Sequence, residues 1–85
     1  MQTIWKYPLP FPAEDAIILM HQGARILALQ LQNDIPTLWV ELDPALPLIT
    51  RHFRFYGTGH ELSERRSAYV GTFQQPPFVW HVYEE

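Results

Sequence analysis

The stretch Arg25–Leu42, RILALQLQNDIPTLWVEL, predicts a β-hairpin whose two arms specify each other's register. With a two-residue turn at Asn33–Asp34, the first pair outside the turn is Gln32 with Ile35. One face then carries apolar pairs: Leu31 with Pro36, Leu29 with Leu38, and Leu27 with Val40. The opposite face is mixed: Gln30 with Thr37, Ala28 with Trp39, and Ile26 with Glu41. A slip of one residue would exchange the two faces, so the register is well specified and Leu29 and Leu38 are expected to be buried neighbours.

Length and composition predict a single folded domain over residues 1–85. Hydrophobic residues make up 47% of the chain, which provides enough apolar surface to offset the chain entropy lost on folding. The chain contains no cysteine, which excludes disulfides and thiolate metal sites, and it has no long apolar run for a membrane. The net charge of −3 disfavours nucleic acid as a partner. These features predict a cytoplasmic protein that needs no cofactor.

Three further segments alternate or favour β-structure: Gln2–Tyr7, Ala16–Met20 and Ile49–Tyr56. The prolines of residues 8–12 predict an extended surface segment after the first of them, because proline blocks both helix and interior strand. Residues 60–66 are polar and charged, which predicts a loop or a single helical turn. The expected fold is therefore all-β: a small antiparallel barrel or sandwich of five to six short strands.

The end of the chain predicts a second hairpin, Ser67–Gln74 with Pro77–Tyr83, joined around Gln75–Pro76. This register pairs Phe73 with Phe78, Gly71 with Trp80, and Tyr69 with Val82, so that an aromatic ring covers the strand glycine. Both faces of this hairpin are apolar, and something must cover the second face. The candidates are the proline-rich segment or another copy of the protein. The second is favoured, so the sequence predicts a homo-oligomer.

Six segments together resemble a family of small proteins of unknown function that bacteriophages and prophages encode. They are Trp5–Leu9, Gly23–Leu27, Pro36–Trp39, Tyr56–His60, Tyr69–Gln74 and Val79–Glu84. The resemblance covers nearly the full chain. It implies an early or accessory role in phage biology, which would place the protein in the host cytoplasm, and it brings no catalytic residue with it.

The glycine turn Gly57, Thr58, Gly59 and His60 is the best candidate for an anion site. Consecutive backbone N–H groups in a turn can form a concave donor site, and the guanidinium groups of Arg54, Arg65 and Arg66 suit phosphate oxygens. The turn lacks the lysine of a P-loop and the third glycine of a dinucleotide fingerprint. A strand-ending turn that needs positive φ at a glycine is the simpler interpretation.

Other chemistry has weaker support. The histidines have no metal-ligand spacing, so no metal site is expected. Glu61 beside His60 could serve acid–base chemistry in a weak hydrolase, but the charged residues there are also typical of a solvated turn. No serine or threonine has the surroundings of an activated nucleophile, so the protein is expected not to be an enzyme.

Trp39 lies on the mixed face of the central hairpin and is a candidate anchor for a partner or for ring stacking. Two function classes follow from the sequence. The first is a non-catalytic phage accessory protein that binds a small phosphorylated or nucleotide-type ligand, for example a host defence signal. The second is a module that blocks or adapts a host or phage protein through an aromatic surface. A concave site lined by arginines would favour the first class, and a flat apolar patch the second.

Overall fold

The computed structural model describes all of residues 1–85 and consists of seven β-strands without a helix. The all-β class is confirmed, and the expected number of five to six strands is corrected to seven. No segment of the fold is a helix that could cross a membrane. The strands are β1 (Thr3–Pro8), β2 (Asp15–His21), β3 (Arg25–Gln32), β4 (Ile35–Leu42), β5 (Leu48–Gly57), β6 (Ala68–Gln75) and β7 (Phe78–Glu84).

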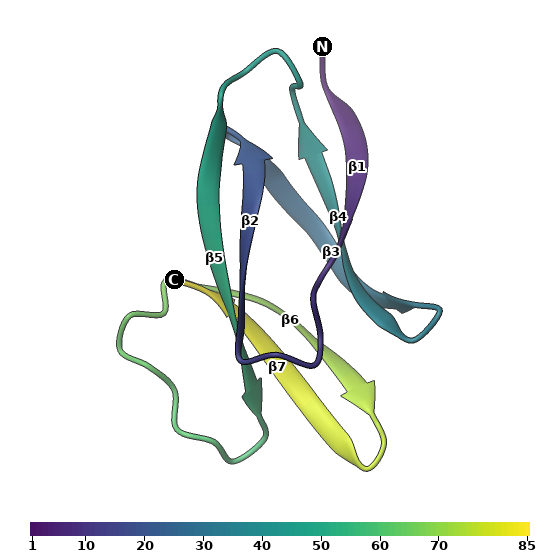
Figure 1. Cartoon of the computed structure of the whole chain (residues 1–85), viewed down its shortest axis with the longest axis vertical. Helices are drawn as coiled ribbons and strands as arrows, with labels where there is room; N and C mark the ends of the chain where they lie inside the picture. Colours follow the sequence, from purple (N-terminus) through teal and green to yellow (C-terminus); the bar gives the residue numbers. More distant parts are fainter.

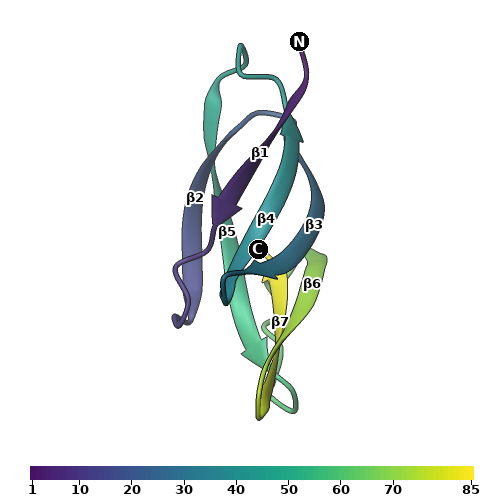
Figure 2. The same cartoon turned by 90° about the vertical axis from the view of Figure 1, so that its right-hand side faces the viewer.

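The strands form two antiparallel sheets, in the orders β1-β4-β3 and β2-β5-β7-β6 (Figure 1). The side view shows the three-stranded sheet in front of β2 and β5, with β6 and β7 below (Figure 2). The two sheets pack as a sandwich and do not close into a barrel, because β1 does not pair with β2 and β3 does not pair with β6. Of the two expected architectures, the sandwich is the one that forms.

The central hairpin has the predicted register over five pairs, from Gln32–Ile35 to Ala28–Trp39. Both turn residues have positive φ, 51° at Asn33 and 65° at Asp34, as a type I′ turn requires. A β-bulge at Leu27 then shifts the pairing, so that Ile26 faces Val40 and Arg25 faces Glu41. The predicted pairs Leu27–Val40 and Ile26–Glu41 are therefore wrong, because a bulge leaves one residue unpaired and alters the register beyond it.

The last hairpin exists, but its register differs from the prediction by two residues. Its turn lies at Pro76–Pro77, so Phe73 pairs with Trp80 and Gly71 pairs with Val82. From Gly71 to Gln75 this two-residue shift keeps each side chain on its predicted face. A bulge at Val70 then pairs Tyr69 with Tyr83, so the predicted pair Tyr69–Val82 is wrong and Tyr69 joins the face of Thr72 and Tyr83. The neighbours change, however, and no tryptophan covers the glycine. Leu29 of the other sheet fills that place, since a Cβ atom added at Gly71 would lie 2.9 Å from the Leu29 Cβ.

We expect Gly71→Ala to destabilise the protein by about 1–3 kcal/mol, because the new methyl group has no room between β6 and β3. Denaturant unfolding followed by circular dichroism measures the change. Gln74→Ala, at an exposed position of the same strand, is the matched control and should change stability by less than about 0.5 kcal/mol. Equal stabilities of the two variants would show that the sheets do not approach each other at Gly71.

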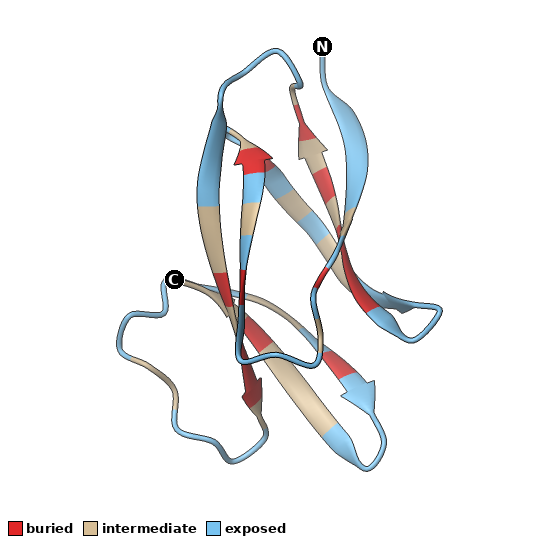
Figure 3. Cartoon of the chain, in the orientation of Figure 1, coloured by how far each residue is buried: buried red, intermediate tan, exposed pale blue.

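The core lies between the sheets (Figure 3). Leu38 is fully buried, whereas Leu29 opposite it is half-buried, so one of the two predicted neighbours keeps partial contact with solvent. The fully buried side chains come from both sheets. The largest of them are Phe53, Met20, Leu38, Leu42, Val40 and Val82.

The proline-rich connection between β1 and β2 does more than cross the surface. Leu9 is buried, and the ring of Phe11 packs at centroid distances of 5.2 Å from Phe73 and 5.3 Å from Trp80. This segment therefore covers the inner face of the last hairpin. Tyr69 and Phe78 remain 58% and 59% exposed. The homo-oligomer stays a prediction, with less of the hairpin left for an interface to cover.

Candidate ligand-binding site

Most backbone N–H groups of the glycine turn at the end of β5 are already hydrogen-bonded within the protein. The His60 N–H donates to the Gly57 carbonyl at 3.0 Å, and the Thr58 N–H donates to the Val79 carbonyl at 3.1 Å. The Gly57 N–H donates to Nδ1 of the His60 ring at 3.1 Å. Gly59 has a φ of 91°, where glycine is strongly favoured. Three of the four donors that an anion would need are thus already used, and only the Gly59 N–H has no partner within the chain.

A pocket of about 260 Å³ lies over this turn on the outer face of the four-stranded sheet. No carboxylate is among its lining residues, although the chain as a whole is acidic. Its polar groups are a hydroxyl, two imidazole rings and two phenol rings. The lining residues are Tyr56, Gly57, Thr58, Gly59, His60, Leu62, His81 and Tyr83.

An arginine guanidinium lies over each of the two tyrosine rings of this pocket. The guanidinium carbon of Arg54 lies 5.9 Å from the ring centroid of Tyr56, and that of Arg66 lies 5.9 Å from the ring centroid of Tyr83. The two rings meet edge to face, with centroids 5.9 Å apart. Neither guanidinium has a carboxylate within 4.0 Å. We call Arg54, Tyr56, Arg66 and Tyr83 the tyrosine platform.

Strand periodicity and pairing explain how the platform forms. Arg54 and Tyr56 are two residues apart on β5, so both side chains point to the outer face. Tyr83 of β7 lies directly opposite Arg54 in the ladder, and this places it on the same face. Only Arg66 comes from outside the strands.

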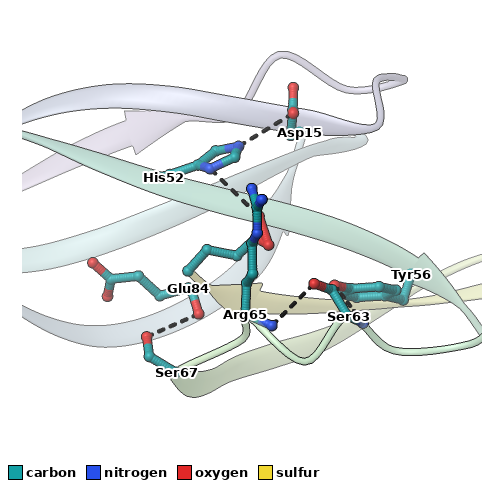
Figure 4. A network of polar contacts seen from close by, with 8 residues as sticks. Asp15, His52, Tyr56, Ser63, Arg65, Ser67 and Glu84 are labelled. Atoms are coloured by element: carbon teal, nitrogen blue, oxygen red, sulfur yellow. Dashed lines mark hydrogen bonds and ion pairs between the residues drawn. The ribbon is translucent and has the colours of Figure 1, made fainter.

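The β5–β6 loop folds back over β5 and positions Arg66. The Ser63 N–H donates to the Tyr56 hydroxyl at 3.2 Å, and Nη1 of Arg66 donates to the Ser63 carbonyl at 2.9 Å. The Arg65 N–H donates to the Ser63 hydroxyl at 3.1 Å (Figure 4). The guanidinium of Arg65 makes no ion pair and is exposed. Tyr56 is therefore buried beneath the loop that carries both arginines.

A chain of hydrogen bonds runs through His81 beside the platform. Nδ1 of His81 lies 2.9 Å from the Thr72 hydroxyl, which also contacts the Tyr69 hydroxyl, and Nε2 lies 2.7 Å from the Thr58 hydroxyl. Thr58 donates its proton to the Val79 carbonyl at 3.3 Å. One proton arrangement satisfies every contact: His81 donates from Nε2 to Thr58 and accepts at Nδ1 from Thr72. Thr58 then has no base to remove its proton, so this arrangement is not that of an activated nucleophile.

A larger pocket of about 510 Å³ lies on the other side of His60, between the β1–β2 loop and the end of β5. Arg54 and His60 border it, but so do Glu14 and Glu61. Two carboxylates to one arginine disfavour an anion in this pocket. Its aromatic lining residues are Phe11, Phe55, Tyr56 and Trp80.

The structure brings together most of the residues that the sequence nominated. Those on the outer face or at the glycine turn are Arg54, Gly57, Thr58, Gly59, His60 and Arg66. Arg65 lies on the loop beside them. Trp39 does not join them, because it is half-buried on β4 of the three-stranded sheet, where Lys6 and Ala28 are its cross-strand neighbours.

Sequence reasoning missed three residues of the site: Tyr56, His81 and Tyr83. The alternation of β5 could have identified Tyr56, which shares a face with Arg54. His81 and Tyr83 depend on the pairing of β5 with β7, which no local pattern reveals. The His60 ring packs over Gly57 and against Trp80, at a centroid distance of 6.2 Å. No group of three or more histidine, aspartate or glutamate residues is arranged to hold a metal ion.

Comparison with known proteins adds one finding. Neither a curated protein nor a solved structure matches the chain significantly. A family model matches residues 1–85, the whole length of the chain, and its description is a domain of unknown function. The protein therefore belongs to the DUF7352 family.

Proposed function

We propose that the protein binds a small anionic ligand of the phosphorylated or nucleotide type on the tyrosine platform. The observation that supports this most strongly is the pair of guanidinium groups, Arg54 and Arg66, each over a tyrosine ring and neither in an ion pair, although Asp15 lies opposite Arg54 in the ladder. Arginine binds phosphate by two parallel hydrogen bonds, and a cation–π contact with each ring at 5.9 Å favours the position of the guanidinium group before a ligand binds.

The adjoining pocket suits the uncharged part of such a ligand. It is open to the outer face and contains the aromatic edges of Tyr56 and Tyr83 together with the Thr58 hydroxyl. A base or sugar ring can contact aromatic side chains there while its phosphate reaches the arginines. No carboxylate lines the pocket, so none would repel an anion at contact distance there.

Binding without turnover is the role that fits this site, because the Thr58 hydroxyl donates its hydrogen bond to the Val79 carbonyl, which leaves Nε2 of His81 to donate to Thr58 rather than to act as its base. Within the phage setting that the sequence resemblance implies, sequestration of a host defence signal is a role that requires only binding. In this proposal the protein is an accessory factor that lowers the free concentration of its ligand.

Protein–protein interaction is the second candidate function, and exposed apolar side chains favour it. Several large ones lie on the surface of this small chain, far from the tyrosine platform in the sequence. The most exposed among the strands of its N-terminal half are Ile4, Trp5, Ile17, Leu19 and Ile35. In this alternative the platform arginines would either contact the partner protein or remain in solvent.

Replacing Arg54 with glutamate should weaken binding of a phosphorylated ligand by about 100-fold or more, because a charge-assisted contact is lost and a repulsive one is added. The melting temperature should change by less than about 3 °C, because Arg54 has no ion pair to lose. Isothermal titration calorimetry against nucleotides, cyclic dinucleotides and ADP-ribose derivatives measures the binding.

Arg25→Glu is the matched control, since Arg25 is an exposed arginine on the other sheet. This variant should bind as the unmodified protein does. If the whole panel produces no heat with unmodified protein, or if both variants lose affinity equally, the tyrosine platform is not an anion site and protein–protein interaction becomes the better proposal.

A further inference from the structure

The sandwich has four edge strands, β1 and β3 in one sheet and β2 and β6 in the other. Exposed edges pair readily with other chains, and proteins usually block them with lysine, proline, glycine or a bulge. β1 carries Lys6 and Pro8, and β3 has its bulge at Leu27. β6 has a bulge at Val70 followed by Gly71, which lies against β3.

β2 is the edge strand without any such protection. Its sequence, DAIILMH, has no lysine, proline or glycine, and its ladder with β5 is continuous from Asp15 to His21. The only ionisable residues are Asp15 and His21 at its two ends. A strand of this composition at a free sheet edge is a template for another strand.

Two hydrogen bonds show which backbone groups of β2 face outward. The Phe55 N–H donates to the Glu14 carbonyl, and the Gln22 N–H donates to the Pro47 carbonyl. Even-numbered residues of this ladder therefore bond to β5, since hydrogen-bonded pairs alternate along an antiparallel ladder. The N–H and C=O groups of Ile17 and Leu19 point to the free edge. None of the backbone bonds outside the ladders involves them.

The side chains beside this edge are also unusually exposed. Ile17 is 68% exposed and Leu19 is 58% exposed, and both project from the outer face of the sheet. Leu48, opposite His21 on β5, is 54% exposed. Free backbone groups and uncovered apolar side chains thus occur along the same strand.

We propose that β2 pairs with β2 of a second copy of this chain, antiparallel and about a two-fold axis at Ile18. The two four-stranded sheets then become one continuous sheet. In this register Ile17 lies opposite Leu19 of the second copy, and each residue exchanges both of its outward hydrogen bonds with its partner. Ile17 and Leu19 of both copies cover one another on the outer face.

The charged residues at the two ends of β2 favour a second copy of this chain as the strand that pairs with it. The same register places Asp15 opposite His21 of the second copy, at both ends of the interface. Nδ1 of His21 donates to the Leu46 carbonyl at 2.7 Å, and the ring packs 5.5 Å from that of Trp5, so Nε2 is the nitrogen through which the imidazolium form would donate to a carboxylate. Asp15 contacts His52 at 3.2 Å and remains half exposed. A shift of two residues would place either Asp15 opposite Leu19 or His21 opposite Ile17, and the other charged residue would lie beyond the end of the partner strand.

Sedimentation velocity from low micromolar to near millimolar concentration tests this interface, whose only residue next to the tyrosine platform is Asp15, opposite Arg54 in the β2–β5 ladder. We expect the unmodified protein to reach twice the 10.0 kDa chain mass. Leu19→Lys and Ile17→Lys should each remain monomeric over the same range and keep the unmodified circular dichroism spectrum, since both positions are exposed in the single chain. Ile4→Lys, at a position 55% exposed on the β1 edge, is the matched control and should still form the dimer.

Amide hydrogen exchange followed by NMR tests the register. In the dimer, the outward amides of Ile17 and Leu19 should exchange at least about 10-fold more slowly than in Leu19→Lys, and the outward amide of Ile4 should not change. A monomer at every concentration would overturn the proposal. So would a dimer that survives both lysine substitutions, or one in which the Ile17 and Leu19 amides exchange as fast as in Leu19→Lys.

Discussion

Replacing Phe53 with alanine should lower the free energy of unfolding by about 3–5 kcal/mol, the range found when a buried phenylalanine is truncated. Phe53 is fully buried in the middle of β5 and is among the largest buried side chains of the protein. Domains of this size are often stable by only about 5–10 kcal/mol. The variant is therefore expected to be partly unfolded at 37 °C, and chemical denaturation at low temperature measures the loss.

Phe78→Ala makes the same chemical change at a residue that is 59% exposed. It should cost less than about 1 kcal/mol, because little apolar surface returns to water. If Phe53→Ala also costs less than about 1 kcal/mol, the residue cannot occupy the centre of the core.

Glu84→Ala should destabilise the protein by about 2–4 kcal/mol, because it leaves the charge of Arg51 uncompensated at the edge of the core. Nε and Nη2 of Arg51 each donate to a carboxylate oxygen of Glu84 at 2.7 Å, and Nη1 donates to the Ala24 carbonyl at 2.6 Å. The side chains of the pair are 16% and 19% exposed, so the expected loss is somewhat below that for a completely buried pair.

The double variant Arg51→Met/Glu84→Leu is the informative comparison. It removes both charges together, and it should be more stable than Glu84→Ala by at least about 1 kcal/mol, since apolar replacements of an ion pair are often tolerated. The hydrogen bond to Glu84 raises the pKa of Arg51 above its ordinary value. A raised pKa of a basic group stabilises the fold below the unfolded-state pKa, so this contribution is fully present at neutral pH and is lost only in strong alkali. Additive effects of Arg51→Met and Glu84→Leu would show that the two side chains do not interact.

The central hairpin was predictable because the residues that determine its register are close together in the sequence. Turn residues and apolar alternation within Arg25–Leu42 agree on one register, and five pairs form as expected. The bulge at Leu27 was not predictable in the same way. It moves Ile26 into the place opposite the buried Val40, and that advantage depends on the core beyond the hairpin.

The last hairpin shows where local information is insufficient. Pairing Gln74 with Pro77 and pairing Gln75 with Phe78 keep the same faces, so alternation cannot distinguish the two registers. The neighbour of Gly71 also lies outside the hairpin, since Leu29 of the other sheet approaches it. The segments that became β1 and β2 were recognisable as β-structure, but their partners β4 and β5 lie far along the chain and no local pattern identifies them.

The sequence could predict the charged residues of the candidate site, but it could not predict which aromatic residues lie beside them. Arg54 and the glycine turn are close in sequence, so their proximity in space follows directly. Tyr83 reaches Arg54 only through the pairing of β5 with β7. The backbone donors of the turn were expected to be free, and most of them bond to Val79, to His60 or within the turn.

The order β2-β5-β7-β6 has a consequence for how the protein folds during synthesis. β7 lies between β5 and β6, although it follows both of them in the chain. Until residues 78–84 leave the ribosome, β6 has no strand of its sheet to pair with, and Phe55 lacks the cross-strand neighbour Val82 that completes its side of the core. The nascent chain can therefore complete the three-stranded sheet and pair β2 with β5, but its larger sheet stays two strands wide until β7 is available. Chaperones that bind apolar nascent segments would meet β6 during that interval.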